Sequence, residues 1–533
     1  MKIKKVTIKN FRSIFECDFC FNDLLALVGE NNNGKSNIID AIEMISKTKV
    51  NNVFDFKNKS NPIEIEVVFH ELTDFEKEKL SAYLEGDLFI LKKEFLYKEK
   101  ENGEPDSESK MYYIKDSELK PTKAQNIFAG ETLPEFYKVP AVKELKEETK
   151  ITTTTYFGKF LDLLFDSDDY DFANLDKILE EINTELNRVD KNAPLVKGAK
   201  EIEVIMCEQF KGCCLKFEID TPKRKNLISE MEIFADDGCR TPLSSKGHGT
   251  QRAFIFSILL LYAQKLNEKL KSTDGKDKKD IIIAIEEPEV YLHPHQQRII
   301  YKLFKKLIDI EAEQIQIVYT THSSFMINIE DYKYLGLVTK NDIEKGTKVT
   351  QCTEDIFEGD EKKEFKMACQ FDPERNELFF ADKIILCEGD TEKYSLPVIF
   401  DKLGINLIDK RISVVECGSK NGIPLFQKVL NKFNEKEKKF NYYIFYDLDI
   451  PPKKSDDAKH EQQLEKEAQK INKGIEDLVS DKNKRFIFNP DLERHLKLEI
   501  GEENKPYKTR EKISESSFKI PEDLKKFVKA NFS

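Results

Sequence analysis

Long apolar runs, tryptophan and an excess of positive charge are all missing from this 533-residue sequence. No stretch reaches the roughly eighteen apolar residues that a membrane-spanning helix needs, and the first residues enter a strand pattern instead of a signal peptide. The net charge of −12 argues against a protein that coats nucleic acid generally, although it does not exclude a local basic groove. We therefore expect a soluble, cytoplasmic protein.

Zinc-binding cysteine spacing is also lacking. Ten cysteines are scattered along the chain, and only Cys17 and Cys20 have half-site zinc spacing, without a second pair of that spacing. Because these two lie in an alternating, strand-like stretch, we interpret them as packing residues with reduced thiols. At about 150 residues per domain, the length predicts two to four domains.

What the sequence does contain is a phosphate-binding loop. Residues 29–36 fit G-x-x-x-x-G-K-[ST] at every fixed position, between a short apolar strand (residues 24–28) and a helical pattern (residues 37–45). In such a loop, Lys35 reaches the terminal phosphates of ATP and the Ser36 hydroxyl holds Mg²⁺. The predicted nucleotide-binding residues are Gly29, Asn32, Asn33, Gly34, Lys35 and Ser36.

Two later apolar strands end in polar residues that suit the same site. The strand at residues 281–285 ends in Glu286, which can position the Mg²⁺ ion, and Glu287, which can orient the attacking water. A second strand, residues 315–319, is followed by His322, which could sense the γ-phosphate. Together with the loop, these residues predict an ATPase.

Periodicity divides the first 372 residues into three parts. Alternating apolar residues predict a hairpin before the loop and an antiparallel sheet after it. From residue 132 to residue 198 the spacing becomes helical, which predicts an insertion for packing or dimerisation. We expect an N-terminal ATPase lobe at residues 1–131, the helical insertion at 132–198 and a C-terminal ATPase lobe at 199–372.

Beyond residue 372, alternating strands and helices predict a separate domain, residues 373–533, with a parallel sheet. Its first strand ends at Glu388, and its third ends at Asp447 and Asp449. Because parallel strands end along one edge of a sheet, these carboxylates are expected to meet there. Clustered carboxylates repel one another unless a divalent cation lies between them, and oxygen ligands suit Mg²⁺ or Mn²⁺. Because strands alternate with helices both here and around the phosphate loop, the predicted fold class of the chain is α/β.

The order of loop, Ser/Gly turn (residues 244–252), acidic strand end and histidine resembles the ABC-type ATPases of the structural-maintenance and RecF-like group. The resemblance implies a dimer of two heads that sandwich ATP, with Ser245 and Gly247 of the turn completing the partner's site. Glu286 stands where that family usually has Asp, and we identify no glutamine for the metal. Efficient ATP turnover is therefore not expected.

Residues 383–493 resemble a Toprim domain, and an ATPase head joined to a Toprim domain resembles the overcoming-lysogenization-defect (OLD) nucleases, which include the Gabija antiphage systems. This resemblance implies DNA cleavage with two metal ions and a lysine near the C-terminus. Lys505 fits that lysine best, with Lys508 and Lys526 as alternatives. The implied metal ligands are Glu388, Glu392, Asp447, Asp449 and Glu493.

The favoured function is a metal-dependent DNA endonuclease, controlled by ATP binding at a dimeric head and active in antiphage defence, with a UvrD-like helicase as a possible partner. Two alternatives stay open: a DNA-repair ATPase of the RecF-like type with a degenerate Toprim docking domain, and a Toprim enzyme that acts on nucleotides or RNA. Candidate DNA-phosphate contacts are short basic runs at residues 92–93, 223–225, 438–439 and 453–454.

Overall fold

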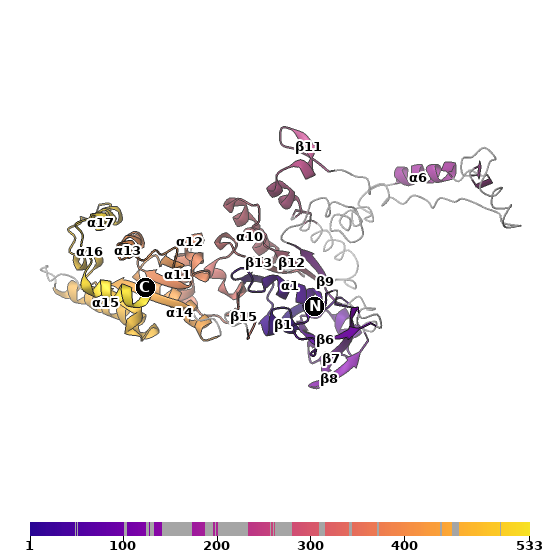
Figure 1. Cartoon of the computed structure of the whole chain (residues 1–533), viewed down its shortest axis with the longest axis horizontal. Coiled ribbons are helices and arrows are strands. Elements are labelled where there is room, and N and C mark those ends of the chain that lie inside the picture. Colours follow the sequence, from indigo (N-terminus) through magenta and orange to yellow (C-terminus); the bar gives the residue numbers. More distant parts are fainter. Residues whose placement is uncertain are drawn as a thin grey trace. The chain divides into compact units, whose positions relative to one another are not determined.

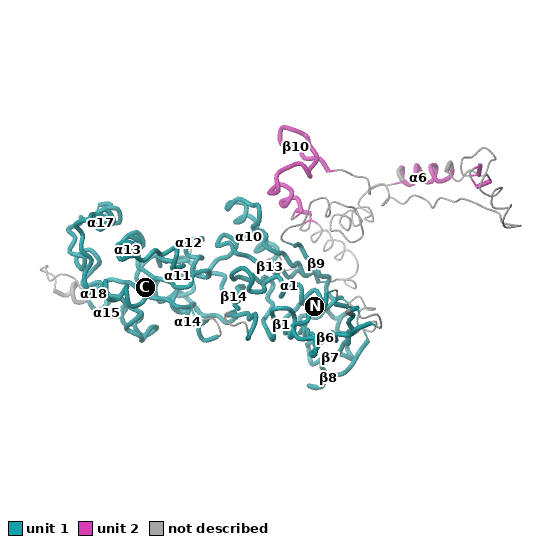
Figure 2. Tube along the Cα trace, in the orientation of Figure 1, with its two compact units in different colours: residues 1–141, 279–533 teal, residues 142–278 magenta. Residues whose placement is uncertain are grey.

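A computed structural model describes residues 1–47, 49–50, 52–100, 104–123, 127, 133–140, 173–186, 196–197, 199–200, 233–255, 257–258, 261, 280–308, 315–340, 344–369, 372–436, 440–449, 458–501 and 503–533. It has two units, one of residues 1–141 and 279–533 and one of residues 142–278 (Figure 2). Among the described helices, none has both the length and the apolarity that crossing a bilayer would need. Figure 1 shows the mixed α/β architecture that the sequence predicts.

An antiparallel sheet forms the N-terminal part of the first unit. Its strand order is β2-β1-β4-β6-β7-β8, with the short β5 paired to β6. Alternate residues of β4 are buried and half-exposed, which is the pattern expected for a sheet with one face on a core. The elements are β1 (Lys2–Phe11), β2 (Ile14–Cys20), η1 (Val53–Asp55), β4 (Ile63–His70), α2 (Asp74–Leu80), β5 (Leu84–Glu85), β6 (Leu88–Glu99), β7 (Pro105–Lys115) and β8 (Glu118–Thr122).

A second, mostly parallel sheet carries the phosphate loop, in the strand order β15-β14-β3-β13-β12-β9. Every residue of β3, β12 and β13 is buried, because both faces of these central strands are covered. The elements are β3 (Leu24–Val28), α1 (Lys35–Glu43), β9 (Glu135–Val139), β12 (Ile281–Glu286), α10 (Pro294–Ile308), β13 (Ile315–Thr321), η3 (Ser324–Met326), η4 (Ile329–Tyr334), β14 (Leu335–Thr339) and β15 (Lys348–Gln351).

Strand β9 corrects the expected start of the helical insertion. It lies within residues 132–198, yet it pairs in parallel with β12 and so belongs to the nucleotide-binding sheet. A five-residue strand next to a long helical pattern has too weak a periodic signal to be separated from it. The second unit accordingly begins at residue 142.

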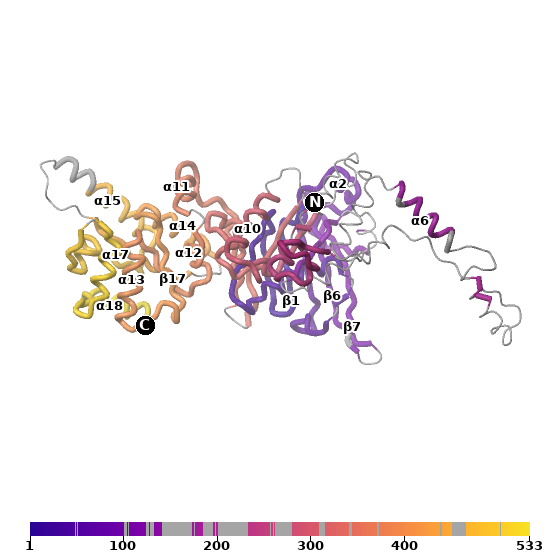
Figure 3. The backbone as a smooth tube through the Cα atoms, turned by 90° about the horizontal axis from the view of Figure 1, so that it is seen from above, coloured from indigo at the N-terminus to yellow at the C-terminus, as the bar shows by residue number. Residues whose placement is uncertain are grey.

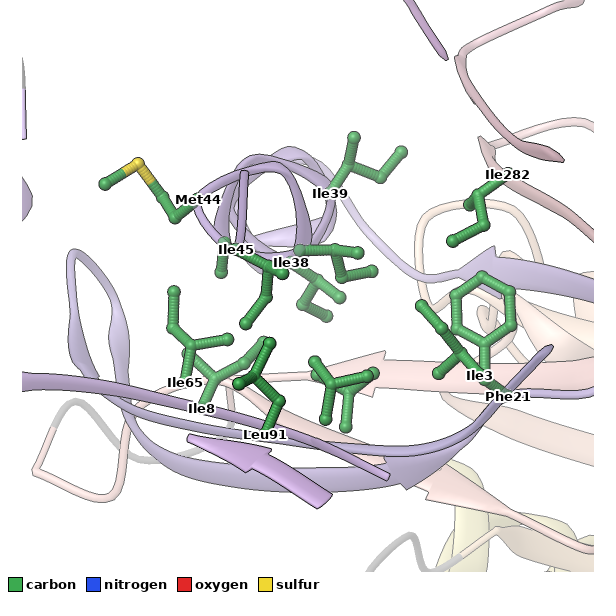
Figure 4. Packing of buried hydrophobic residues seen from close by; sticks show 14 of the residues in the cluster. Ile3, Ile8, Phe21, Ile38, Ile39, Met44, Ile45, Ile65, Leu91 and Ile282 are labelled. Atoms are coloured by element: carbon green, nitrogen blue, oxygen red, sulfur yellow. The ribbon is translucent and has the colours of Figure 1, made fainter. Parts of the chain in front are cut away.

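Helix α1 joins the two sheets through one hydrophobic core. Figure 4 shows Ile38 and Ile45 facing Ile8, Ile65 and Leu91 of the antiparallel sheet. Each of these side chains is less than one tenth exposed. Burial of an isoleucine contributes about 1.5–3 kcal/mol, so this core fixes the helix that starts at the phosphate loop.

A buried lysine also holds the end of α1. Lys93 of β6 is 2% exposed, and its Nζ donates to the carbonyl oxygens of Ile45 (2.9 Å) and Lys47 just beyond the helix. A cation is favourable at a helix C-terminus, where carbonyl groups lack partners. Lys93 therefore does not serve as the DNA-phosphate contact that the run at residues 92–93 suggested.

Replacing Lys93 with alanine is expected to lower the free energy of unfolding by about 2–4 kcal/mol, because it removes a buried side chain and its hydrogen bonds to carbonyls. The neighbouring Lys92→Ala is the matched control. Lys92 pairs with Glu64 and Glu94 near the surface, so its loss should cost less than about 1 kcal/mol. Chemical denaturation of both variants compares the two losses, and equal losses would contradict the capping role.

A four-stranded parallel sheet, in the order β17-β16-β18-β19, forms the C-terminal part of the first unit. Buried side chains of α13, α17 and α18 form one hydrophobic cluster with side chains of this sheet. Figure 3 shows these three helices near one another. The elements are α11 (Gly359–Cys369), α12 (Pro373–Asn376), η5 (Glu377–Phe379), β16 (Lys383–Cys387), α13 (Asp390–Lys402), β17 (Ile412–Glu416), η6 (Lys420–Gly422), α14 (Ile423–Asn434), β18 (Asn441–Asp447), α15 (Ala458–Leu478), η7 (Lys482–Lys484), β19 (Arg485–Phe488), α16 (Leu492–His495), α17 (Lys505–Ser514) and α18 (Glu522–Phe532).

The second unit contains α6 (Ala173–Leu186), β10 (Phe234–Asp236), β11 (Arg240–Pro242), η2 (Leu243–Ser245) and a helical segment from residue 248. Helix α6 matches the predicted helical periodicity. The basic runs at residues 223–225, 438–439 and 453–454 lie outside the described residues.

Candidate functional site

The phosphate loop connects β3 to α1, as its sequence predicts. Gly34, with φ of 97°, adopts a conformation that L-residues avoid, and a Cβ there would lie 2.4 Å from Thr347 Oγ1. Gly29 is equally confined, since its Cβ would lie 2.3 Å from the carbonyl oxygen of Val338. Asn33 donates from Nδ2 to that same oxygen at 3.1 Å. The loop is thus held tightly against β14, on residues that leave no space for larger side chains.

Lys35 lies inside the loop and is held by its carbonyl groups. Its Nζ donates to the carbonyl oxygens of Gly29 and Glu30, both at 2.9 Å, and lies 2.8 Å from His322 Nε2. Burial lowers the pKa of Lys35 to about 8, although the negative charges of Glu287 and Glu289 oppose this shift. The ammonium group is therefore charged at neutral pH and ready to exchange neutral acceptors for phosphate oxygens.

The acidic strand end lies beside this loop, because Glu286 of β12 is opposite Thr320 of β13, and Thr321 is opposite Val28. Glu286 is 9% exposed, and its Oε1 lies 3.3 Å from Lys138 Nζ. Lys138 comes from β9 and also pairs with Asp40 of α1. Sequence reasoning missed Lys138, since only the pairing of β9 with β12 brings it here.

The predicted sensor His322 follows β13 and is fixed by its neighbours. Its backbone N–H donates to Glu289 Oε1 at 2.7 Å, and its Nε2 lies 3.6 Å from Glu287 Oε1. Burial and the charge of Lys35 lower the pKa of His322, so its imidazole is neutral at pH 7. Glu289, whose pKa burial raises, also accepts from Thr321 Oγ1 at 2.9 Å. Glu289 is a positioning residue that the sequence analysis did not single out.

Ser245 and Gly247 lie in an exposed turn of the second unit. The Gln251 side chain donates from Nε2 to the carbonyl oxygens of Ser244 (3.0 Å) and Lys246 (2.7 Å), which closes the turn ahead of the helical residues. The backbone N–H groups of Thr250 and Gln251 both bond to the Gly247 carbonyl. Ser245 and Gly247 thus precede a helical segment, and their part in an anion-binding signature turn stays a prediction.

Five carboxylates gather at the C-terminal edge of the four-stranded sheet. Asp447, at the end of β18, is 8% exposed, and burial together with the charges of the other four raises its pKa to about 9. Burial also raises the pKa of Glu392 to about 7. The cluster consists of the predicted residues Glu388, Glu392, Asp447, Asp449 and Glu493.

Lys505 joins this cluster from the first turn of α17. Its Nζ lies 3.1 Å from Glu493 Oε2, and this carboxylate helps to raise the pKa of the lysine. Asp447 Oδ1 accepts a hydrogen bond from the backbone N–H of Leu492 at 3.0 Å, which ties β18 to α16. Of the three lysines considered from sequence, Lys505 is the one with this contact.

The cluster includes a second lysine that sequence reasoning did not assign. Lys420, at the start of η6 in the loop after β17, donates from Nζ to the Asp447 carbonyl and lies 2.9 Å from Asp449 Oδ2. Its position after a strand of a parallel sheet is the signal that could have identified it. Without the strand order, however, the sequence does not indicate which acid it meets.

Donor chemistry at the cluster fits a divalent cation. Glu388 Oε2 and Glu493 Oε1 are buried without a hydrogen-bond partner, and such carboxylate oxygens suit Mg²⁺ or Mn²⁺. Within the described residues, no three His, Cys, Asp or Glu side chains already converge as a ligand set. Cation binding between these carboxylates therefore requires side chains to turn.

The phosphate loop also contacts the C-terminal domain. Glu30 of the loop forms an ion pair with Arg411, the residue just before β17, and Arg411 Nε lies 3.7 Å from Asp382 Oδ2. A cavity of about 360 Å³ lies here, lined by Gly29, Asn33, Val338, Phe380 and Arg411 among others. The nucleotide loop and the sheet that carries the acids thus share a contact.

Comparisons with known proteins agree with this two-part organisation. Residues 1–327 match the AAA ATPase domain family, and residues 379–449 match the family described as overcoming lysogenization defect protein-like, TOPRIM domain. A protein of Thermus scotoductus (strain ATCC 700910 / SA-01) named OLD nuclease is 25% identical, across 99% of this chain and 98% of that protein.

Two further relatives are of similar identity. The Old nuclease of Escherichia phage P2 is 25% identical, across 81% of this chain and 75% of that protein. The Endonuclease GajA of Bacillus cereus (strain HuB5-5) is 24% identical, across 74% of this chain and 61% of that protein. All three alignments cover most of this chain, so the likeness is not confined to the nucleotide-binding part.

Proposed function

Because the chain belongs to the AAA ATPase domain family and carries an OLD-like Toprim domain, we propose that it is a metal-dependent DNA endonuclease controlled by ATP binding. The observation that carries this proposal is the gathering of five carboxylates and Lys505 at one sheet edge. Relatives named as nucleases support the reaction class.

Glu388, Glu392, Asp447, Asp449 and Glu493 would hold two Mg²⁺ or Mn²⁺ ions. Such ions supply a lowered pKa for an attacking water and neutralise charge on a phosphodiester. Lys505 keeps its proton at Nζ beside Glu493, so it can donate to a phosphate oxygen and stabilise developing negative charge. No side chain of the cluster needs to act as a covalent nucleophile.

The proposal is tested by incubating supercoiled plasmid with the protein and Mg²⁺ or Mn²⁺, beside the Asp447→Ala/Asp449→Ala variant. Nicking by the unaltered protein alone supports the endonuclease. The absence of nicking with either metal would favour the alternative, an ATPase with a degenerate Toprim docking domain. All five proposed metal-binding acids are present, and two of their buried oxygens lack hydrogen-bond partners, which argues against a degenerate Toprim domain.

ATP is proposed to act more as a regulator than as a fuel. Glu286 is engaged by Lys138, which supports slow hydrolysis. The ion pair between Glu30 and Arg411 connects the phosphate loop to the start of β17. The loop that follows β17 carries Lys420, which contacts Asp449 of the acidic cluster. If nucleotide binding moves Glu30, it would therefore shift the position of β17, the strand that leads to Lys420 at the acidic cluster.

The Arg411→Met variant should lose the effect of ATP on nicking. An effector typically changes the property it controls by about 5–150-fold, and in this variant the ratio of nicking rates with and without ATP should fall to less than about twofold. ATP affinity should stay within about threefold, because Arg411 pairs with the loop's side chain and not with its backbone. Nicking rates with and without ATP give the measurement. Lys410→Met, the adjacent exposed lysine, is the control, and a full ATP effect in Arg411→Met would contradict this route.

The wider proposal concerns assembly and biology. Two heads are proposed to pair, with Ser245 and Gly247 of one subunit completing the ATP site of the other, and their exposure is compatible with this. A role in antiphage defence in the cytoplasm is part of the same proposal, and the likeness to the protein named Endonuclease GajA motivates the defence role. In that role a UvrD-like helicase subunit is a further proposed partner.

A further inference from the structure

Lys420 is a buried cation that the proposed reaction leaves without a role. It starts η6, in the loop from β17 to α14, and is 6% exposed. Its Nζ donates to the carbonyl oxygen of Asp447 and lies 2.9 Å from Asp449 Oδ2. A lysine is seldom buried this far unless its charge is paired, and here the pairing is with the carboxylate cluster itself.

Both sides of this contact are held by the fold. On the lysine side, a Cβ at Gly422 would lie 2.0 Å from the Cys417 carbonyl oxygen, so the loop is packed closely against the strand end. On the acid side, Asp449 has a positive φ of 52°, and its backbone N–H donates to the Pro490 carbonyl at 2.9 Å. The fold therefore fixes the buried lysine and the backbone of Asp449, whose side chain is 45% exposed.

The contact makes the two sides of the acidic cluster unequal. Asp449 Oδ2 already accepts from an ammonium group, whereas Glu388 Oε2 is buried without a hydrogen-bond partner. A divalent ion near Asp449 would meet the like charge of Lys420 at close range, on the side of the 45% exposed Asp449 side chain that faces the buried lysine. An ion near Glu388 would instead satisfy an oxygen that lacks a partner.

We propose that Lys420 acts as an internal counter-ion that holds Asp449 and opposes the second divalent ion, so that the site loads its two ions in order. The first ion binds on the Glu388 side, and the second binds only when Asp449 is released from Lys420. This inference rests on the proposed metal-dependent function. It makes Lys420 a positioning residue that sets metal stoichiometry.

The test is a Mn²⁺ titration of the full chain without nucleotide, followed by electron paramagnetic resonance of the free ion. The unaltered protein should bind a first ion at least about tenfold more tightly than a second. Lys420→Met should tighten the second ion by at least about tenfold and the first by a smaller factor, because Lys420 contacts Asp449 directly and acts on Glu388 only through its charge. Lys420→Arg, which keeps the charge, should behave like the unaltered protein.

Lys428→Met is the matched control, because it removes the same charge from α14, where Lys428 pairs with Glu361. Its two Mn²⁺ affinities should not change. If Lys420→Met does not fold, as judged by circular dichroism, Lys420→Gln takes its place with the same expected result. Unchanged or weakened second-ion binding in a folded Lys420→Met or Lys420→Gln protein would overturn the inference.

Failure of the proposed function gives a different result. If Asp447→Asn leaves the Mn²⁺ binding of the unaltered protein as it was, the acidic cluster is not the metal site, and the endonuclease proposal fails together with this one. If Asp447→Asn removes Mn²⁺ binding but Lys420→Met changes nothing, only the role of Lys420 is refuted.

Discussion

Asp447→Asn is expected to slow plasmid nicking by at least about 10²-fold. Loss of a single partner that only supports a metal ligand already costs about 10–100-fold, and Asp447 is proposed as a ligand itself. Asparagine keeps the shape and an oxygen that can accept from the Leu492 backbone N–H, so the link between β18 and α16 should persist. The measurement is the initial nicking rate at saturating Mg²⁺ and Mn²⁺.

Stability should change in the opposite direction, which separates lost chemistry from lost folding. The pKa of Asp447 is raised from 3.8 to about 9, so the folded protein binds a proton that the unfolded chain has released. A raised carboxyl pKa contributes stability at low pH, and this contribution is lost as the pH rises from about 4 to about 9. Asp447→Asn should therefore be at least as stable as the unaltered protein at pH 7 in chelator, with an advantage that grows with pH.

The control for this prediction is Asp401→Asn, at an exposed position near the end of α13. Its nicking rate should stay within about twofold of the unaltered protein, since exposed substitutions away from a site have small effects. Nicking by Asp447→Asn at a rate close to normal would remove the acidic cluster from the reaction. A large loss of stability in Asp447→Asn would instead mean that the carboxyl group is structural.

Lys35→Ala is expected to weaken ATP binding by about 10–150-fold. Hydrogen bonds to a charged group contribute about 1.5–3 kcal/mol each, and a factor of ten in affinity corresponds to 1.4 kcal/mol. Because the bonds of Lys35 to described residues go to carbonyl oxygens of the loop and to His322, its removal should leave the C-terminal sheet unchanged. Isothermal titration gives the ATP affinity, and nicking without ATP should stay within about threefold of normal.

This prediction has a pH signature. Burial lowers the pKa of Lys35 from 10.5 to about 8, and only the protonated ammonium pairs with phosphate. ATP affinity should therefore be constant below about pH 7 and should fall as the pH rises through 8, by up to tenfold per pH unit. Lys35→Ala should lack this fall. Lys47→Ala, beyond the other end of α1, serves as the control, and an unchanged affinity in Lys35→Ala would refute the loop assignment.

Local chemistry is what the sequence by itself determined. The phosphate loop could be predicted because its function depends on adjacent residues, and Gly34 adopts the positive φ that its glycine permits. The acidic cluster could be predicted because parallel strands end along one edge, which places Glu388 and Asp447 together whatever the details of packing. Periodicity alone also predicted the parallel sheet of β16 to β19.

Partners distant in sequence were decided only by the tertiary structure. Lys138 meets Glu286 because β9 lies beside β12, Lys93 is buried under the end of α1, and Lys420 meets Asp449 across the strand order β17-β16-β18. A lysine in a charged sequence has many acids within reach, and its periodic pattern does not say which one it meets. Which charge neutralises which carboxylate, and so where cations and phosphates can bind, follows from the packing of strands and helices in three dimensions.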